Sequence, residues 1–162
     1  MKKCCLFLIL ALLLTGCGTA ETFERVQDEG EVPVMAQMRA VNLECPESAV
    51  IQVMESEQQK LYLCGEYTLT VQTFASGDLN RTIRDLCGYE AQVVRPVETR
   101  TGELRRIDWV WTAMGEGGDQ VGRALVLDDG NYHYCLTAMA DADIAGSLAG
   151  EWNGVFSSFS LA

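Results

Sequence analysis

Residues 104–138 read LRRIDWVWTAMGEGGDQVGRALVLDDGNYHYCLTA, and this stretch decides the predicted fold. Three apolar runs are separated by the short connections GEGGD and DDGN, whose residues tolerate a positive φ. Such connections join antiparallel strands, because a parallel crossover needs a dozen or more residues. Together with a preceding run that is joined by TRTG, the sequence predicts an antiparallel meander of strands at Glu90–Thr99, Leu104–Met114, Gln120–Leu127 and Tyr132–Ala138.

Shorter alternating runs upstream of the meander predict further strands. Gly65-Glu66 lies between two of these runs, and two residues containing Gly at such a point are typical of a tight hairpin. Pro46 ends the first run. The predicted segments are Met38–Cys45, Val50–Met54, Leu61–Cys64 and Tyr67–Phe74.

Two helices are predicted, one before and one after the four-strand meander. Asp78 is the expected N-cap of the first, since its carboxylate can accept free N–H groups, and Gly88 supplies a left-handed stop. The apolar stripe of this helix, Leu79, Ile83 and Leu86, is expected to lie on the sheet as a cover. The second helix is expected to start at Asp141 or Asp143 and to carry Ile144, Leu148, Trp152, Val155 and Phe156.

This order of elements predicts an α+β domain with an antiparallel sheet covered by helices. The stretch from Asp78-Leu79 through RALVL at 123–127 and YHYCLT at 132–137 to FSSF at 156–159 resembles the PsbP-like group, named after an extrinsic subunit of photosystem II. The resemblance covers the carboxyl-terminal half of the chain and implies an antiparallel sheet sandwiched between helices. Members of that group are chiefly binding or assembly factors, and no functional residue is carried over from it.

The amino terminus has the pattern of an export signal. Lys2 and Lys3 precede an uncharged apolar run from Cys4 to Leu14, which is about half of the ~20 residues needed to cross a bilayer. Leu14-Thr15-Gly16-Cys17 matches a lipobox, in which small residues fit the peptidase and the thiol accepts a diacylglyceryl group before cleavage. An ordinary signal peptide with an incidental cysteine is the alternative. We therefore expect a bacterial lipoprotein in which residues 1–16 are the signal peptide and Cys17 carries lipid.

Residues 17–33 are acidic and lack periodicity, so we expect a tether there and a single globular domain at 34–162. Removing Lys2 and Lys3 from the 12 basic residues leaves 10 against 23 acidic ones, a formal charge of −13. Nucleic acid and anionic headgroups are repelled by such a surface. The expected contacts are the membrane, through the lipid on Cys17 at the extracytoplasmic face, and a protein partner in the cell envelope. The domain is expected to be a monomer.

Four cysteines remain in the predicted domain, an even number in an export context. They allow three disulfide pairings, and their places in the predicted elements favour Cys45 with Cys64 and Cys87 with Cys135. Four buried free thiols are the alternative. The spacings of 19, 23 and 48 residues disfavour zinc, whose ligands usually come in close pairs, so no metal or cofactor is expected.

His133 is the only histidine in the chain, and it shares a predicted strand face with Cys135. The pair suggests a thiol nucleophile and its base, but side chains two residues apart on a strand lie about 6.5–7 Å apart, beyond hydrogen-bond reach. A structural histidine is therefore expected, and no catalytic residue is assigned. Trp109 and Trp111, which share a face, are expected to fill the core.

The other polar clusters have structural interpretations. Asp128-Asp129 are expected to form a turn, Asp141 and Asp143 to cap a helix, and Gly115–Asp119 to form a hairpin tip without the Lys of a phosphate-binding loop. The sequence thus predicts a non-catalytic binding or assembly module. The alternative is a cell-envelope enzyme or thiol-redox protein that uses His133 and Cys135.

Overall fold

The computed structural model of the chain describes residues 36–56, 59–115 and 117–162. The predicted signal peptide, the lipid-bearing Cys17 and the predicted tether lie outside the described residues. No helix in the described part of the chain is long and apolar enough to cross a membrane.

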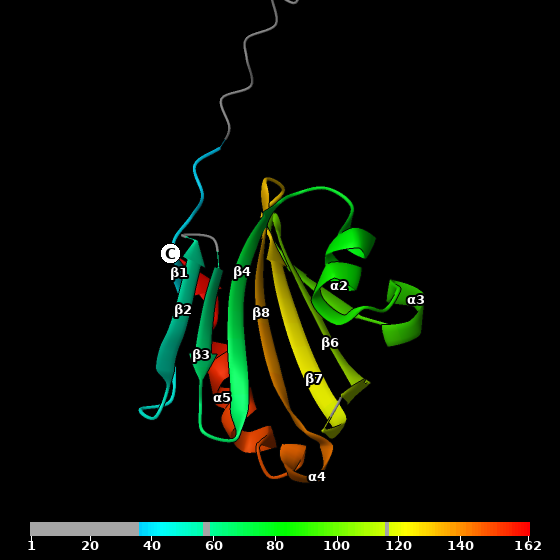
Figure 1. Cartoon of the computed structure of the whole chain (residues 1–162). Helices are drawn as coiled ribbons and strands as arrows, with labels where there is room; N and C mark the ends of the chain where they lie inside the picture. Colours follow the sequence, from blue (N-terminus) through cyan, green and yellow to red (C-terminus); the bar gives the residue numbers. More distant parts are fainter. Residues whose placement is uncertain (1–35, 57–58, 116) are drawn as a thin grey trace, which may run out of the picture. The chain divides into compact units, whose positions relative to one another are not determined.

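Seven strands form one sheet in the order β2-β3-β4-β8-β7-β6-β5 (Figure 1). Every neighbouring pair is antiparallel, so the predicted meander and fold class are confirmed. A separate pairing joins β1 (Val41–Asn42) to β9 (Ser160–Leu161). The sheet strands are β2 (Val50–Ser56), β3 (Gln59–Leu63), β4 (Tyr67–Ala75), β5 (Val97–Thr101), β6 (Leu104–Gly115), β7 (Gly118–Asp128) and β8 (Tyr132–Asp141).

Helix α2 (Leu79–Cys87) has the predicted ends. An Asp78 carboxylate oxygen accepts the Asn80 N–H at 3.0 Å, which satisfies a free donor of the first turn. Gly88 adopts φ 77° and donates its N–H to the Arg84 carbonyl at 2.7 Å, so a residue that tolerates the left-handed region ends the helix.

The two faces of the sheet carry separate apolar clusters, because side chains alternate along each strand. On β8, Tyr134 and Leu136 belong to one cluster and Cys135, between them, belongs to the other. Helix α5 (Ala149–Ser158) covers the first face with Trp152, Val155 and Phe156. Helix α2 covers the second face with Ile83, which packs with Ile107, Trp109, Trp111, Ala124, Val126 and Cys135 (Figure 1).

The predicted strand at Glu90–Thr99 is wrong in its first half, which forms the short helix α3 (Ala91–Val94). Arg95 takes a left-handed φ of 50° and donates its N–H to the Ala91 carbonyl at 2.8 Å, which closes the turn. Pro96 has no N–H to donate to a ladder, and β5 begins only at Val97.

Two other predicted elements have different bounds. The segment predicted as the second helix forms two helices, α4 (Ala142–Ala145) and α5. The break lies at Ser147, whose N–H and hydroxyl both donate to the Ile144 carbonyl, at 2.9 and 2.6 Å. That carbonyl is no longer available to the N–H four residues on. The predicted strand Met38–Cys45 is reduced to β1, since its partner β9 has only two residues.

The four described cysteines are free thiols, so neither predicted pair, Cys45 with Cys64 or Cys87 with Cys135, forms a disulfide. The Cys87 thiol turns back along its own helix and donates to the Ile83 carbonyl at 3.1 Å. Cys135 is fully buried in the cluster beneath α2, and Cys64 is buried in the cluster beneath α5. All four are free thiols, but the alternative of four buried thiols holds only for Cys64 and Cys135, since Cys45 and Cys87 are partly exposed.

Candidate functional site

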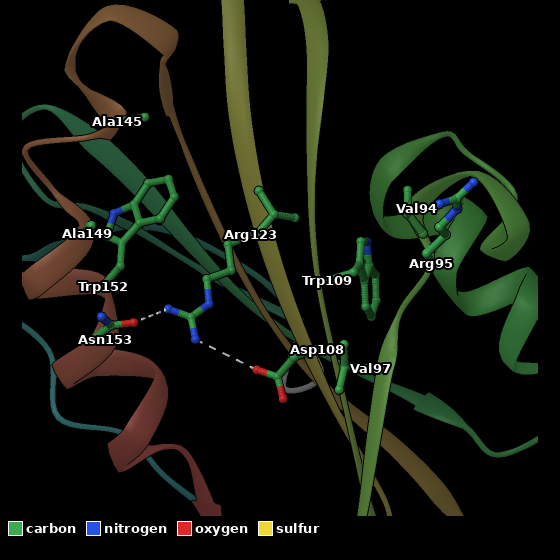
Figure 2. Close-up of a pocket in the computed structure, with 11 residues that line it drawn as sticks. Val94, Arg95, Val97, Asp108, Trp109, Arg123, Ala145, Ala149, Trp152 and Asn153 are labelled. Atoms are coloured by element: carbon green, nitrogen blue, oxygen red, sulfur yellow. Dashed lines mark hydrogen bonds and ion pairs between the residues drawn. The ribbon is translucent and has the colours of Figure 1, made fainter.

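A groove of about 590 Å³ lies on the α5 side of the sheet, and we call it the β6 groove. Its volume is within the range of ligand pockets. Figure 2 shows Trp152 and Asn153 of α5 on one side, Val94 and Arg95 on the other, and Arg123 and Asp108 between them. The lining residues are Val94, Arg95, Val97, Asp108, Trp109, Val110, Arg123, Ala145, Ala149, Trp152 and Asn153.

The groove exists because β5 covers only part of β6. The register pairs Val97, the first residue of β5, with Asp108 of β6, so β6 continues past Asp108 without a neighbouring strand on that side. Helix α3 takes the place beside it, and the Tyr89 hydroxyl donates to the Thr112 carbonyl at 3.0 Å. A second, smaller cavity of about 250 Å³ opens between α3 and β6, with Val94 and Val110 in both linings.

Two valines of the groove, and a third that lines the smaller cavity beside it, are exposed. Val93, Val97 and Val110 have exposed fractions of 62%, 65% and 56%, although they are apolar and lie on regular elements. A scattered exposed valine needs no explanation, but neighbouring ones that border cavities are typical of a binding surface.

Arg123 brings a positive charge to the groove, and the carboxylate of Asp108 offsets only part of it. Its guanidinium lies 4.3 Å from the centre of the Phe156 ring and donates to the Asn153 side-chain oxygen at 2.7 Å. The nearest carboxylate, Asp108, is 3.9 Å away and accepts two hydrogen bonds from Arg106 instead, at 2.9 and 3.2 Å. Burial lowers the pKa of Arg123, and Asp108 opposes that shift, yet a guanidinium stays charged at neutral pH.

Arg95 lines the groove on the side of α3, whereas Arg123 lies between that side and α5 (Figure 2). Arg95 is the one non-glycine residue with a positive φ in the described part of the chain, and it forms no ion pair among the described residues. Two arginines therefore border an apolar groove on a domain whose net charge is strongly negative. An apolar partner that also carries an anionic group fits this arrangement.

Two tryptophans of the lining, Trp109 and Trp152, have indole N–H groups that are buried without a partner among the described residues. Unsatisfied buried donors are uncommon in folded proteins. Trp109 reaches the groove from the face that α2 covers, and Trp152 reaches it from α5. As the sequence predicts, the rings of Trp109 and Trp111 fill the core, and the ring of Trp152 is buried as well.

His133 lies in a buried network on the other face of the sheet. Its Nδ1 is 2.8 Å from the Thr82 hydroxyl and its Nε2 is 3.7 Å from the Asp128 carboxylate, which also binds Arg105 at 2.8 Å. His133 is 1% exposed and Asp128 is 4% exposed. Burial lowers the pKa of His133, which favours the neutral ring, although Asp128 opposes the shift.

Cys135 does not form a reactive pair with His133. Its thiol is fully buried and approaches the His133 carbonyl at 3.6 Å rather than the imidazole ring, and burial raises its pKa far above the usual range. A thiol that stays protonated is a poor nucleophile. The burial and contacts of His133 support the prediction of a structural histidine, which stays a prediction.

The predicted aspartate roles are partly confirmed. Asp129 accepts the N–H groups of Asn131 and Tyr132, both at 2.9 Å, so it shapes the β7–β8 turn, whereas Asp128 both accepts the Gly130 N–H and holds Arg105. Asp141 is the N-cap of α4 but forms no side-chain capping bond. No group of three or more His, Cys, Asp or Glu in the described residues is arranged to hold a metal.

The sequence analysis did not assign the groove residues. The alternation of β6 puts Val110 on the face opposite the tryptophans, with Arg106, Asp108 and Thr112. An apolar residue in this otherwise polar row was the available signal. No sequence pattern indicated that Arg95 lines the groove, because its position depends on the turn that separates α3 from β5.

Fold and site together define an α+β domain with an antiparallel sheet, helices on both faces and an open groove at one end of the sheet. No known protein family and no curated protein matches the chain. Among solved structures, the chain is similar in fold to LpqN, which is involved in cell envelope biogenesis of Mycobacterium tuberculosis. The identity is 10% and the TM-score 0.51, over 83% of this chain and 87% of LpqN. The resemblance to the PsbP-like group stays a prediction.

Proposed function

We propose that the chain is a bacterial lipoprotein, anchored through Cys17 at the extracytoplasmic face of the cell membrane, whose domain is a non-catalytic binding or assembly module. The β6 groove is its binding surface. We also propose that residues 1–16 are the signal peptide, residues 17–33 the tether and residues 34–162 the single globular domain.

The observation that carries the binding role is the group of exposed valines at the groove. Val97 and Val110 could have been polar without cost to the core, since each is more than half exposed. Their side chains, with Arg95 and Arg123 in the same lining, suit a partner that is apolar and carries an anionic group. The expected partner is a component of the cell envelope.

Two further arguments support a place in the envelope. The lipobox pattern at residues 14–17 predicts a lipid-bearing cysteine at the start of the processed chain. LpqN, which is similar in fold, is involved in cell envelope biogenesis. The alternative, an enzyme or thiol-redox protein built on His133 and Cys135, is disfavoured by the burial of both side chains.

The anchor is tested with Cys17→Ser in the full chain. We expect the variant to leave the membrane fraction and to keep its signal segment or lose it by ordinary processing, because no thiol is present to accept lipid. Cys45→Ser, which removes a cysteine of the domain, is the matched control and should stay with the membrane. Unchanged membrane retention of Cys17→Ser would show that anchoring does not depend on this residue.

The groove is tested by photo-crosslinking in intact cells. A benzophenone side chain at Val110 should give one or a few defined adducts, whereas the same group at Arg81, an exposed position on α2, should not give them. Arg123→Met in the Val110 benzophenone protein should weaken the adducts, because it removes a groove charge. Identical adducts from both positions would refute a binding role for the groove.

A further inference from the structure

The outer edge of β5 is open and charged. β5 is the last strand of the sheet, and all five of its residues, VETRT at 97–101, are exposed. Open edges usually carry charges that prevent pairing with other chains. Here the charges alternate in sign around a central Thr99, with Glu98 before it and Arg100 after it.

The backbone of β5 offers hydrogen-bonding groups to a further strand. Thr101 pairs with Leu104 across the two residues Gly102 and Glu103, and a two-residue hairpin closes on a hydrogen-bonded pair. Val97, Thr99 and Thr101 therefore direct their N–H and C=O groups toward β6. Glu98 and Arg100, which alternate with them, direct theirs toward the open edge.

Arg100 lacks a full charge partner within its own chain. The register places it directly opposite Arg105, and like charges in this position are unfavourable. Glu98 neutralises Arg105 with two hydrogen bonds at 3.0 and 2.9 Å and reaches Arg100 only at 3.6 Å. The Arg100 side chain is 62% exposed.

We propose that the chain self-associates by antiparallel pairing of β5 with β5 of a second copy, about a two-fold axis at Thr99. Glu98 of each copy then lies directly opposite Arg100 of the other, and Thr99 lies opposite Thr99. Each Arg100 gains a carboxylate on the side away from Arg105. The two sheets become one continuous sheet, and the interface is self-complementary as a two-fold requires.

The charge pattern also selects this register. A slip that centred the axis on Arg100 or on Glu98 would place like charges opposite each other, which disfavours those pairings. The contact is a short one, below the ~1,200 Å² of stable interfaces, so we expect a weak association in solution. The proposal replaces the expectation of a monomer and does not depend on the β6 groove.

The test uses Thr99→Cys in the full chain under mild oxidation. Across the axis the two Cα atoms should be about 4.5 Å apart, within disulfide reach. Thr101→Cys is the matched control, because it is equally exposed on the same strand face, yet its two copies would be about 13 Å apart. We expect a covalent dimer from Thr99→Cys on non-reducing gels, roughly tenfold above Thr101→Cys and the wild-type chain.

A charge reversal makes the result specific. Arg100→Glu, added to Thr99→Cys, should reduce the crosslinked fraction roughly fivefold, because it sets Glu98 opposite a second carboxylate. Arg81→Glu, which reverses an exposed arginine on α2, should leave it unchanged. Equal crosslinking at positions 99 and 101, no crosslink at 99, or crosslinking that Arg100→Glu does not reduce would each overturn the proposal.

Discussion

The two faces of strand β6 differ sharply in burial. Ile107, Trp109 and Trp111 are 1%, 4% and 6% exposed beneath α2, whereas Val110, on the opposite face, is 56% exposed. The first face is accounted for by the core that it fills. The opposite face carries an apolar side chain at Val110, where the core does not need one. The buried face of β6 therefore serves stability, and we assign the exposed valine on its other face to binding.

The largest effect is expected at Gly122, on the buried side of the comparison. A Cβ at Gly122 would lie 2.3 Å from the Trp111 ring, which packs directly over this residue. Gly122→Ala must displace the indole from the cluster, and we expect a loss of about 3 kcal/mol in the free energy of unfolding, at the upper end of overpacking effects. Urea denaturation measures the change.

Gly154→Ala is the matched control for Gly122→Ala. Nothing lies within 4 Å of a Cβ at Gly154, which is an exposed position of α5. Alanine should therefore stabilise the helix by about 0.5–1 kcal/mol. Opposite signs at the two glycines would support the packing of Trp111, and a neutral Gly122→Ala would contradict it.

A smaller, pH-dependent effect is expected from His133 on the same buried face. In the unfolded chain the imidazole titrates near 6.5, and burial lowers its pKa in the folded chain, against the attraction of Asp128 and Asp129 and with a contribution from Arg105. The folded state therefore binds fewer protons. Stability is present above pH ~6.5 and is lost as pH falls toward the lower folded value, with a slope of at most about 1.4 kcal/mol per pH unit.

His133→Asn isolates this contribution. The amide can keep the contact with the Thr82 hydroxyl, while the carboxylates titrate in both proteins, so the difference between the two pH profiles belongs to the imidazole. Denaturant midpoints from pH 5 to 7 should fall less steeply in the variant. Parallel profiles for the two proteins would argue against a lowered histidine pKa.

The comparison also shows what the sequence could predict. The alternation of Ile107, Trp109 and Trp111 is a local pattern, and it correctly gave both the strand and its buried face. Asp78 and Gly88 likewise act on their nearest neighbours, so both ends of α2 could be predicted. The order of the short connections was enough to give an antiparallel meander.

What failed depends on backbone and side-chain geometry that neither alternation nor the order of elements reveals. The groove requires β5 to start opposite Asp108, and this depends on the left-handed turn at Arg95, for which alternation gives no signal. The cysteine pairing was inferred from which elements lie near each other. The four thiols are free, and the Cys87 thiol donates to the Ile83 carbonyl within its own helix, a contact that the order of elements does not reveal.

The smallest effect on stability is expected at Val110, on the open side of the comparison. Val110→Thr keeps the β-branched shape at a half-exposed position, so the free energy of unfolding should change by less than about 0.5 kcal/mol. Thr112→Val, the reciprocal change one position along the same face, should be equally mild. Only the first removes an apolar contact of the groove, so it alone should weaken the adducts formed from a benzophenone at Val97. A loss above 1 kcal/mol for Val110→Thr would mean that Val110 is held by the fold, and the contrast between the two faces would no longer separate binding from stability.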